Sequence, residues 1–166
     1  MATIDLANLG STDVGTPSAF TTVGHVYVES REIDLAEVVT EKGSAIAQGD
    51  VITAVPVPAD CLIIGGGIKI TSVMTGTSTD ATIDVGVTGG VVDCLVDGFD
   101  LDAAAANATS LASPMEPQYV AANDTVDILV ATQTGTITGG KILVWVIIAL
   151  VGEEAAKAPG RVQLGS

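Results

Sequence analysis

KILVWVIIALV, residues Lys141–Val151, holds the longest apolar run of the chain and its only Trp. Glycines precede and follow this run, which is about half as long as a helix that spans a bilayer. Its residues are mostly β-branched or aromatic, and such residues favour a strand. We therefore predict a strand here, longer than roughly 30 Å at about 3.3 Å per residue.

Both faces of this strand are apolar, because successive side chains of a strand point to opposite sides. One face carries Ile142, Val144, Val146, Ile148 and Leu150, and the other carries Leu143, Trp145, Ile147, Ala149 and Val151. An antiparallel strand normally buries one face and exposes the other, so a second cover is needed: a helix, a loop or another subunit. We favour another subunit, because few helices are expected and a bare apolar strand promotes aggregation. Leu143, Trp145 and Ile147 are thus candidate subunit-interface residues.

The composition favours an all-β fold of one domain. Of 166 residues 48% are hydrophobic but only 3% aromatic, and Gly is abundant, which is typical of short strands and tight turns. About eight strand candidates separated by turns, without βαβ spacing, predict an antiparallel β-sandwich, with an eight-stranded jelly roll as the favoured form.

Three regions are expected: an N-terminal arm over residues 1–22, the sandwich over 23–152 and a C-terminal tail over 153–166. The pattern predicts strand structure at 26–28 and at 33–39, and a hairpin that joins 125–132 to the Lys141–Val151 strand. The glycines at 65–67 indicate a bulge or a sharp bend, as at a sandwich corner. Residues 103–108 fit either one or two turns of helix or a packed loop.

The formal charge of −14 argues against a nucleic-acid partner, because affinity for nucleic acid depends on basic side chains that neutralise phosphates. It disfavours anionic membrane surfaces for the same reason. The N-terminus shows neither a basic n-region nor an apolar h-region, so we expect synthesis in the cytoplasm.

Residues for enzyme chemistry are scarce. His25 is the only histidine and has no nucleophile motif nearby, so we expect no enzyme activity. Cys61 and Cys94 are expected to be buried free thiols, and with one His they are too few for a zinc site. We predict no cofactor and no metal.

The densest run of oxygen ligands is a set of four aspartates: Asp93, Asp97, Asp100 and Asp102. Carboxylates of this kind can hold calcium, but their spacing does not match the EF-hand loop and its glutamate is missing. A solvated acidic loop is therefore the favoured interpretation over a cation site.

The order of several short motifs over residues 45–150 resembles that of the capsid decoration proteins of tailed phages, also called cement or head-stabilisation proteins. The motifs are Gly49-Asp50-Val51-Ile52, Val57-Pro58-Ala59, Ile64-Gly65-Gly66-Gly67, Asp80–Gly86, Asp97-Gly98, and the segments Asp124–Val126 and Gly140–Trp145. The resemblance implies a jelly roll or related sandwich, present as a homotrimer on the outer capsid surface of the virion, where it clamps neighbouring major capsid protein subunits. It brings no catalytic residues.

The function expected from these features is that of a non-enzymatic virion structural protein that stabilises the capsid. Ile4, Leu6 and Leu9 of the arm are the candidate capsid anchor. Three alternatives stay open: a phage fibre or tail module that binds a receptor or glycan, an enzyme or small-ligand barrel, and a jelly-roll capsid subunit. The scarcity of aromatic residues counts against glycan binding.

Overall fold

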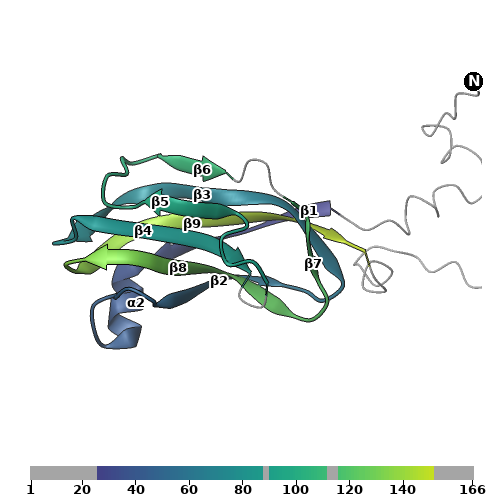
Figure 1. The fold of residues 1–166 in the computed structure, drawn as a ribbon, viewed down its shortest axis with the longest axis horizontal. Coiled ribbons are helices and arrows are strands. Elements are labelled where there is room, and N and C mark those ends of the chain that lie inside the picture. The colour runs from purple at the N-terminus through teal and green to yellow at the C-terminus, as the bar shows by residue number, and fades with distance from the viewer. Residues whose placement is uncertain (1–25, 88–89, 112–115, 152–166) are drawn as a thin grey trace, which may run out of the picture.

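Two antiparallel sheets pack face to face in this protein (Figure 1). The structure is a computed structural model that describes residues 26–87, 90–111 and 116–151. The elements in chain order are β1 (Val26–Asp34), α2 (Leu35–Lys42), β2 (Val51–Val57), β3 (Cys61–Gly76), β4 (Asp80–Val87), β5 (Val96–Asp100), β6 (Thr109–Leu111), β7 (Gln118–Val120), β8 (Asp124–Thr134) and β9 (Ile137–Leu150).

The first sheet has the order β1-β9-β3-β6, with β7 also paired to β3, and is called here the β9 sheet. The second has the order β2-β8-β4-β5 and is called the β8 sheet. Among the described strands, β4 and β5 are the only consecutive pair that is hydrogen-bonded together; most connections cross between the sheets. The predicted all-β antiparallel sandwich is confirmed.

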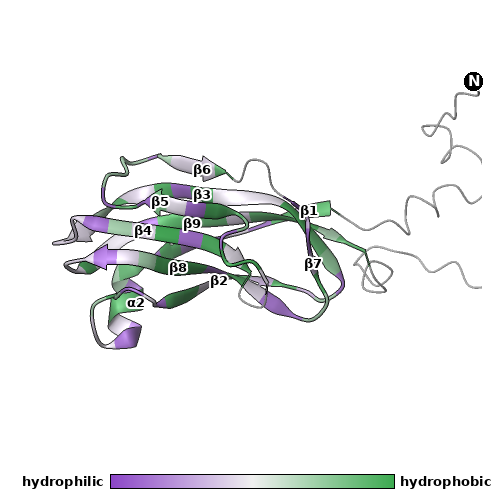
Figure 2. Cartoon of the chain, viewed as in Figure 1, coloured by the Kyte–Doolittle hydropathy of each residue, from purple (hydrophilic) through white to green (hydrophobic). Residues whose placement is uncertain are grey.

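The core lies between the sheets and consists of aliphatic side chains. β9 contributes the row Ile142, Val144, Val146 and Ile148, each at most 1% exposed, and β8 faces it with Val126, Ile128 and Val130. Fully burying one such side chain contributes about 1.5–3 kcal/mol. Figure 2 shows the apolar character concentrated along the central strands.

The predicted hairpin between 125–132 and the Lys141–Val151 strand is wrong. β8 pairs with β2 and β4, whereas β9 pairs with β1 and β3. The short turn around Gly135, where φ is +89°, instead carries the chain from one sheet to the other. β8 and β9 each carry a row of apolar side chains. When the two strands face each other across the sandwich, these rows bury each other more completely than they would side by side in one sheet.

The strand predicted over 33–39 is also wrong beyond Asp34. There β1 ends, and the Asp34 carboxylate accepts a hydrogen bond from the Ala36 amide (2.9 Å), which caps the start of α2. Gly43, with φ at +72°, ends the helix by donating to the Val39 and Thr40 carbonyls. Two local caps of this kind stabilise a helix despite the β-branched valines within it.

The glycines at 65–67 form a bulge and not a corner. β3 is one continuous strand of 16 residues, and its register with β9 shifts between Ile63 and Gly65. Gly67 is needed for close approach, because a Cβ there would lie 2.3 Å from the Ser110 carbonyl oxygen. Residues 103–108 form a loop, in which the Asn107 amide donates to the Ile70 carbonyl.

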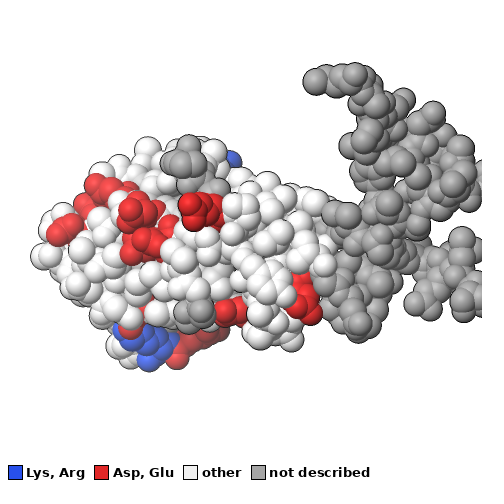
Figure 3. All heavy atoms as spheres, turned by 45° about the vertical axis from the view of Figure 1, so that its right-hand side comes forward, with Lys and Arg blue, Asp and Glu red and all other residues white. Residues whose placement is uncertain are grey.

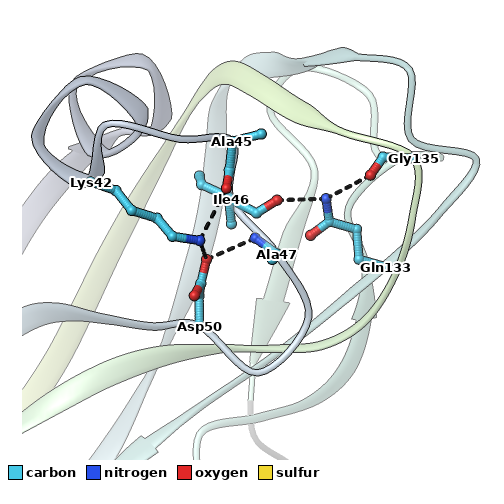
Figure 4. Close-up of polar contacts among 7 residues, drawn as sticks. All are labelled: Lys42, Ala45, Ile46, Ala47, Asp50, Gln133 and Gly135. Atoms are coloured by element: carbon cyan, nitrogen blue, oxygen red, sulfur yellow. Dashed lines mark hydrogen bonds and ion pairs between the residues drawn. The ribbon is translucent and has the colours of Figure 1, made fainter.

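The loop after α2 is held by polar contacts (Figure 4). Lys42 pairs with Asp50 and donates to the Ala45 carbonyl (3.0 Å), and the Asp50 carboxylate accepts from the Ala47 amide (2.7 Å). These contacts with Lys42 and the Ala47 amide lower the pKa of Asp50. Gln133 of β8 donates to the Ile46 carbonyl (2.7 Å), so the loop is tied to the β8 sheet as well.

Asp127 is the one charged residue that is buried among those described, with 6% of its surface exposed. It lies between Thr53 and Gly86 in the β8 sheet, and its Oδ1 has no hydrogen-bond partner. Desolvation raises its pKa, and the nearby Asp124 charge adds to this, while the Thr125 and Thr53 hydroxyls and the Ala54 amide act in the opposite direction. The native state therefore binds this proton more tightly than the unfolded chain does.

Gly67→Ala is expected to destabilise the protein by about 1–3 kcal/mol, because the new methyl group must push β6 away from β3. Gly65→Ala is the matched control, since its Cβ would meet only the flexible end of Ile147, at 3.1 Å. Urea unfolding followed by circular dichroism measures both. Equal stability of the two variants would contradict the close-approach role of Gly67.

Asp127→Asn is expected to raise the melting temperature at pH 7, because the neutral amide removes the cost of burying the carboxylate charge. A carboxyl group whose pKa is raised in the native state stabilises the fold when it is protonated. This contribution is fully present below the unfolded-state pKa of about 4 and is lost as the pH rises through the native pKa. The gain should therefore shrink toward about pH 3. Asp97→Asn, at an exposed position, is the control, and an unchanged or lower melting temperature of Asp127→Asn at pH 7 would refute this account.

Candidate assembly surface

The outer row of β9 contains the three residues predicted to form a subunit interface. Leu143, Trp145 and Ile147 are half-buried, whereas their inner neighbours Val144 and Val146 are fully buried. The strand is thus enclosed by its own chain on one side and partly open on the other. That a second copy covers the open side remains a prediction.

Strand register shows which side chains lie beside this row. Residues that pair directly across antiparallel strands point to the same face. Val26, Val28 and Ser30 of β1 pair with Ala149, Ile147 and Trp145 of β9. On the other side of β9, Leu62 of β3 pairs with Ala149, and Tyr119 of β7 pairs in turn with Leu62.

Together these side chains form a surface that we call the apolar face. Its members are Val26, Val28, Leu62, Leu111, Tyr119, Leu143, Trp145, Ile147 and Ala149. Val26, Val28, Leu111 and Tyr119 are each 58–62% exposed. Single exposed apolar residues are ordinary, but a contiguous group of them marks an interaction surface.

Two glycines of β3 keep the middle of the apolar face open. Gly65 pairs with Ile147 and Gly67 pairs with Trp145. A strand neighbour normally shields part of a large side chain, but glycine has no side chain with which to do so. The glycine run predicted to be a bulge therefore also leaves the Trp145 and Ile147 side chains accessible from the β3 side.

A polar group bounds the apolar face at the α2 end. The Lys141 ammonium lies 3.3 Å from Asp34 and 3.5 Å from Glu32, and Glu32 also accepts from the Thr71 hydroxyl (2.7 Å). Asp34 and Glu32 raise the pKa of Lys141. These side chains are partly exposed, so each ion pair adds little stability; their effect is to make one end of the sheet surface polar.

The rest of the described surface is dominated by acidic side chains. Figure 3 shows them dispersed over one side of the molecule, while most of the basic atoms in view lie in one group beside acids. The basic residues of the described part are Arg31, Lys42, Lys69 and Lys141. In the described part of the chain, no helix has the length and hydropathy to cross a bilayer.

The aspartates at 93–102 do not converge. Asp100 accepts from the Ala103 amide (3.0 Å) and Asp102 accepts from the Ala81 amide. Asp93 and Asp97 are exposed, and the Gly98 amide donates to Asp84 of β4 (2.8 Å). Among the described residues, no three His, Cys, Asp or Glu side chains come together as they would around a metal ion.

Both cysteines are free thiols. Cys61 is fully buried in the core, and desolvation raises its pKa to about 11. Cys94 is half-buried, and desolvation raises its pKa as well. A raised thiol pKa leaves little of the reactive thiolate at neutral pH, so neither residue is suited to nucleophilic chemistry.

Several predicted residues lie outside the described residues: Ile4, Leu6 and Leu9 of the expected anchor, and His25. Conversely, the sequence interpretation missed Val26, Val28 and Tyr119 as parts of the apolar face. The alternation of Val26, Val28 and Ser30 was a usable signal for β1, but the β1–β9 pairing that places them beside Trp145 joins segments more than a hundred residues apart.

No family model matches this chain, and no curated protein matches it. Three solved phage capsid structures contain chains of similar fold. The chain in the capsid of Ralstonia phage GP4 has a TM-score of 0.56 at 21% identity, over 78% of this chain and 86% of that one. The chain in the capsid asymmetric unit of cyanophage Pam1 has a TM-score of 0.53 at 17% identity, over 77% and 86%.

The third is a chain in the acidic stable capsid of Helicobacter pylori bacteriophage KHP30, with a TM-score of 0.52 at 14% identity, over 78% of this chain and 91% of that one. Identities this low establish a shared fold. The sandwich described above is therefore a fold that chains of three phage capsids also adopt.

Proposed function

We propose that this chain is a non-enzymatic structural protein of a phage virion, a homotrimeric decoration (cement) protein on the outer capsid surface. In this role it binds the major capsid protein and stabilises contacts between neighbouring capsid subunits. The observation that carries the proposal is the apolar face, present on a sandwich whose fold recurs in chains of three phage capsids.

The apolar face supports an assembled state because solvent exposure of its side chains is unfavourable. Burying apolar surface contributes about 25 cal/mol per Å², and this surface is continuous across β1, β9 and β3. The strongly acidic remainder opposes association between copies. Association is thus directed to the part of the surface that is poorest in charge, with Trp145 and Ile147 at its centre and Leu143 at its boundary, between Glu32 and Lys69.

Stabilisation of the shell follows from mass action. A protein that binds the assembled capsid and not its separate subunits stabilises the assembly by its own binding free energy. The arm is the proposed anchor, with Ile4, Leu6 and Leu9 as apolar contacts to the capsid. A net charge of −14 suits a protein that faces solvent and not the packaged DNA, since like charges repel.

A jelly-roll capsid subunit is the second candidate, because the similar chains come from capsid structures and the same apolar face could join subunits of a shell. The two functions differ in the order of assembly. A decoration protein adds to heads that have already formed without it, whereas a shell subunit is required for heads to form.

Val28→Asp is expected to convert the trimer into a monomer, because a carboxylate in the apolar face must be desolvated on association. Val51→Asp is the matched control: Val51 is 54% exposed, close to the 62% of Val28, but lies on β2 in the other sheet. Sedimentation velocity at micromolar concentration measures both. A parent chain that is already a stable monomer would overturn the trimer and the role of this surface.

Heads assembled without this protein should bind the purified chain and resist heat better afterwards. We expect the double variant Ile4→Asp/Leu6→Asp to remain trimeric but to bind at least about tenfold more weakly, since each buried aliphatic side chain contributes roughly 1.5–3 kcal/mol. Cosedimentation with heads and electron microscopy give the readout. If no heads form in its absence, the chain is a shell subunit and the decoration role is wrong.

A further inference from the structure

The edge strand β1 is longer or more regular than the other edge strands of the sandwich. Its nine residues pair with β9 without a register shift. At the other edges, β2 carries Pro56 and a register shift after Thr53, β5 is five residues long, and β6 and β7 are three residues each. A long regular edge has a row of unpaired backbone N–H and C=O groups that can accept another strand.

Nothing in the described part of the chain covers this edge. α2 follows β1 directly but turns back over the start of β9, where Ala36 lies against Gly139. From Val26 to Glu32, every side chain of β1 other than that of Tyr27 is exposed. The edge is therefore accessible along most of its length.

The charges of β1 are arranged so that a second copy of the strand fits. Two copies of β1 can pair antiparallel about a two-fold axis perpendicular to the sheet. Such an axis leaves each face of the sheet on its own side, so residues that pair across it must point to the same face. Paired positions therefore differ by an even number, and the axis passes through a residue. Only the axis at Ser30 pairs all nine residues. That axis places Glu29 opposite Arg31 of the second copy, and Arg31 opposite its Glu29.

The neighbouring registers are disfavoured by charge. An axis at Glu29 places the two Glu29 carboxylates opposite each other, and an axis at Arg31 does the same with the two guanidinium groups. Like charges directly opposite are destabilising in a sheet, whereas opposite charges are stabilising. In the Ser30 register the acids Glu32 and Asp34 face the uncharged Val28 and Val26, and both carboxylates lie beside Lys141 of their own subunit.

We propose that β1 is a second contact site between copies of this chain, where two copies join their β9 sheets through antiparallel β1–β1 pairing about a two-fold axis at Ser30. This contact uses the edge of the β9 sheet, and the trimer contact proposed above uses its face. A two-fold contact cannot close a trimer, so in the assembled state it would link copies of different trimers. Its existence does not require the trimer or the capsid role.

Ser30→Cys tests the pairing directly in the full-length chain. Because the axis passes through this position, the Cα atoms of residue 30 in the two copies would lie about 4.5–5.5 Å apart, within the range for a disulfide. Val28→Cys is the control: the two copies of position 28 would be about 13 Å apart, about four strand steps of about 3.3 Å. Mild oxidation should give disulfide dimers of Ser30→Cys at least about tenfold faster than of Val28→Cys or the parent chain.

Charge exchange tests the register. In the Ser30→Cys background, Glu29→Arg should slow cross-linking about tenfold, because both ion pairs become repulsive, and the added Arg31→Glu should restore the rate to within about threefold. Glu41→Arg makes the same change of charge at an exposed α2 position and should have little effect. Cross-linking of Ser30→Cys no faster than that of Val28→Cys, or a double variant as slow as Glu29→Arg alone, would overturn the proposal.

Those results are separable from the proposed function. A parent chain that sediments as a monomer would refute the trimer, and cross-linking would still test the two-fold contact. If the chain is trimeric and binds heads but Ser30→Cys fails to cross-link, only the two-fold contact is refuted.

Discussion

The structure depends on one strand with two apolar rows, of which the described part of the chain buries only one completely. β9 lies in the interior of its sheet, between β1 and β3, and its inner row forms the centre of the core. The opposite sheet supplies the cover for that row. The outer row has only its strand neighbours beside it, and Gly65 and Gly67 supply no side chains. A surface with the composition of a core is left partly open to solvent.

Topology explains why the strands and the helix that the structure describes do not close this surface. Most connections cross between the sheets, so each described strand joins one of the two sheets and none lies over an outer face. The single described helix is eight residues long and packs at one end, beside the start of β9. A cover for the outer row must then come from outside the sandwich.

The polar elements of the fold are local and serve the backbone. Asp34 caps α2, Asp50 fixes the loop that follows, and the aspartates near residue 100 hold turns by accepting amide hydrogen bonds. In the described part, Asp34 and Asp50 line one open hollow beside α2, whereas the aspartates near residue 100 lie elsewhere on the molecule. This distribution suits a structural protein, where charged groups maintain loops and solubility while apolar contacts provide adhesion.

By itself the sequence determined the class of fold, the longest strand and the two faces of that strand, because alternation and β-branching are local properties of consecutive residues. The predicted interface residues Leu143, Trp145 and Ile147 share one row for the same reason. The tertiary structure alone decided that β8 faces β9 across the core and does not pair with it, that residues 35–42 form a helix, and that Val28 and Tyr119 lie on the same outer face as Trp145. These features depend on which distant strands pair, and pairing is decided by how completely apolar rows from separate parts of the chain bury one another.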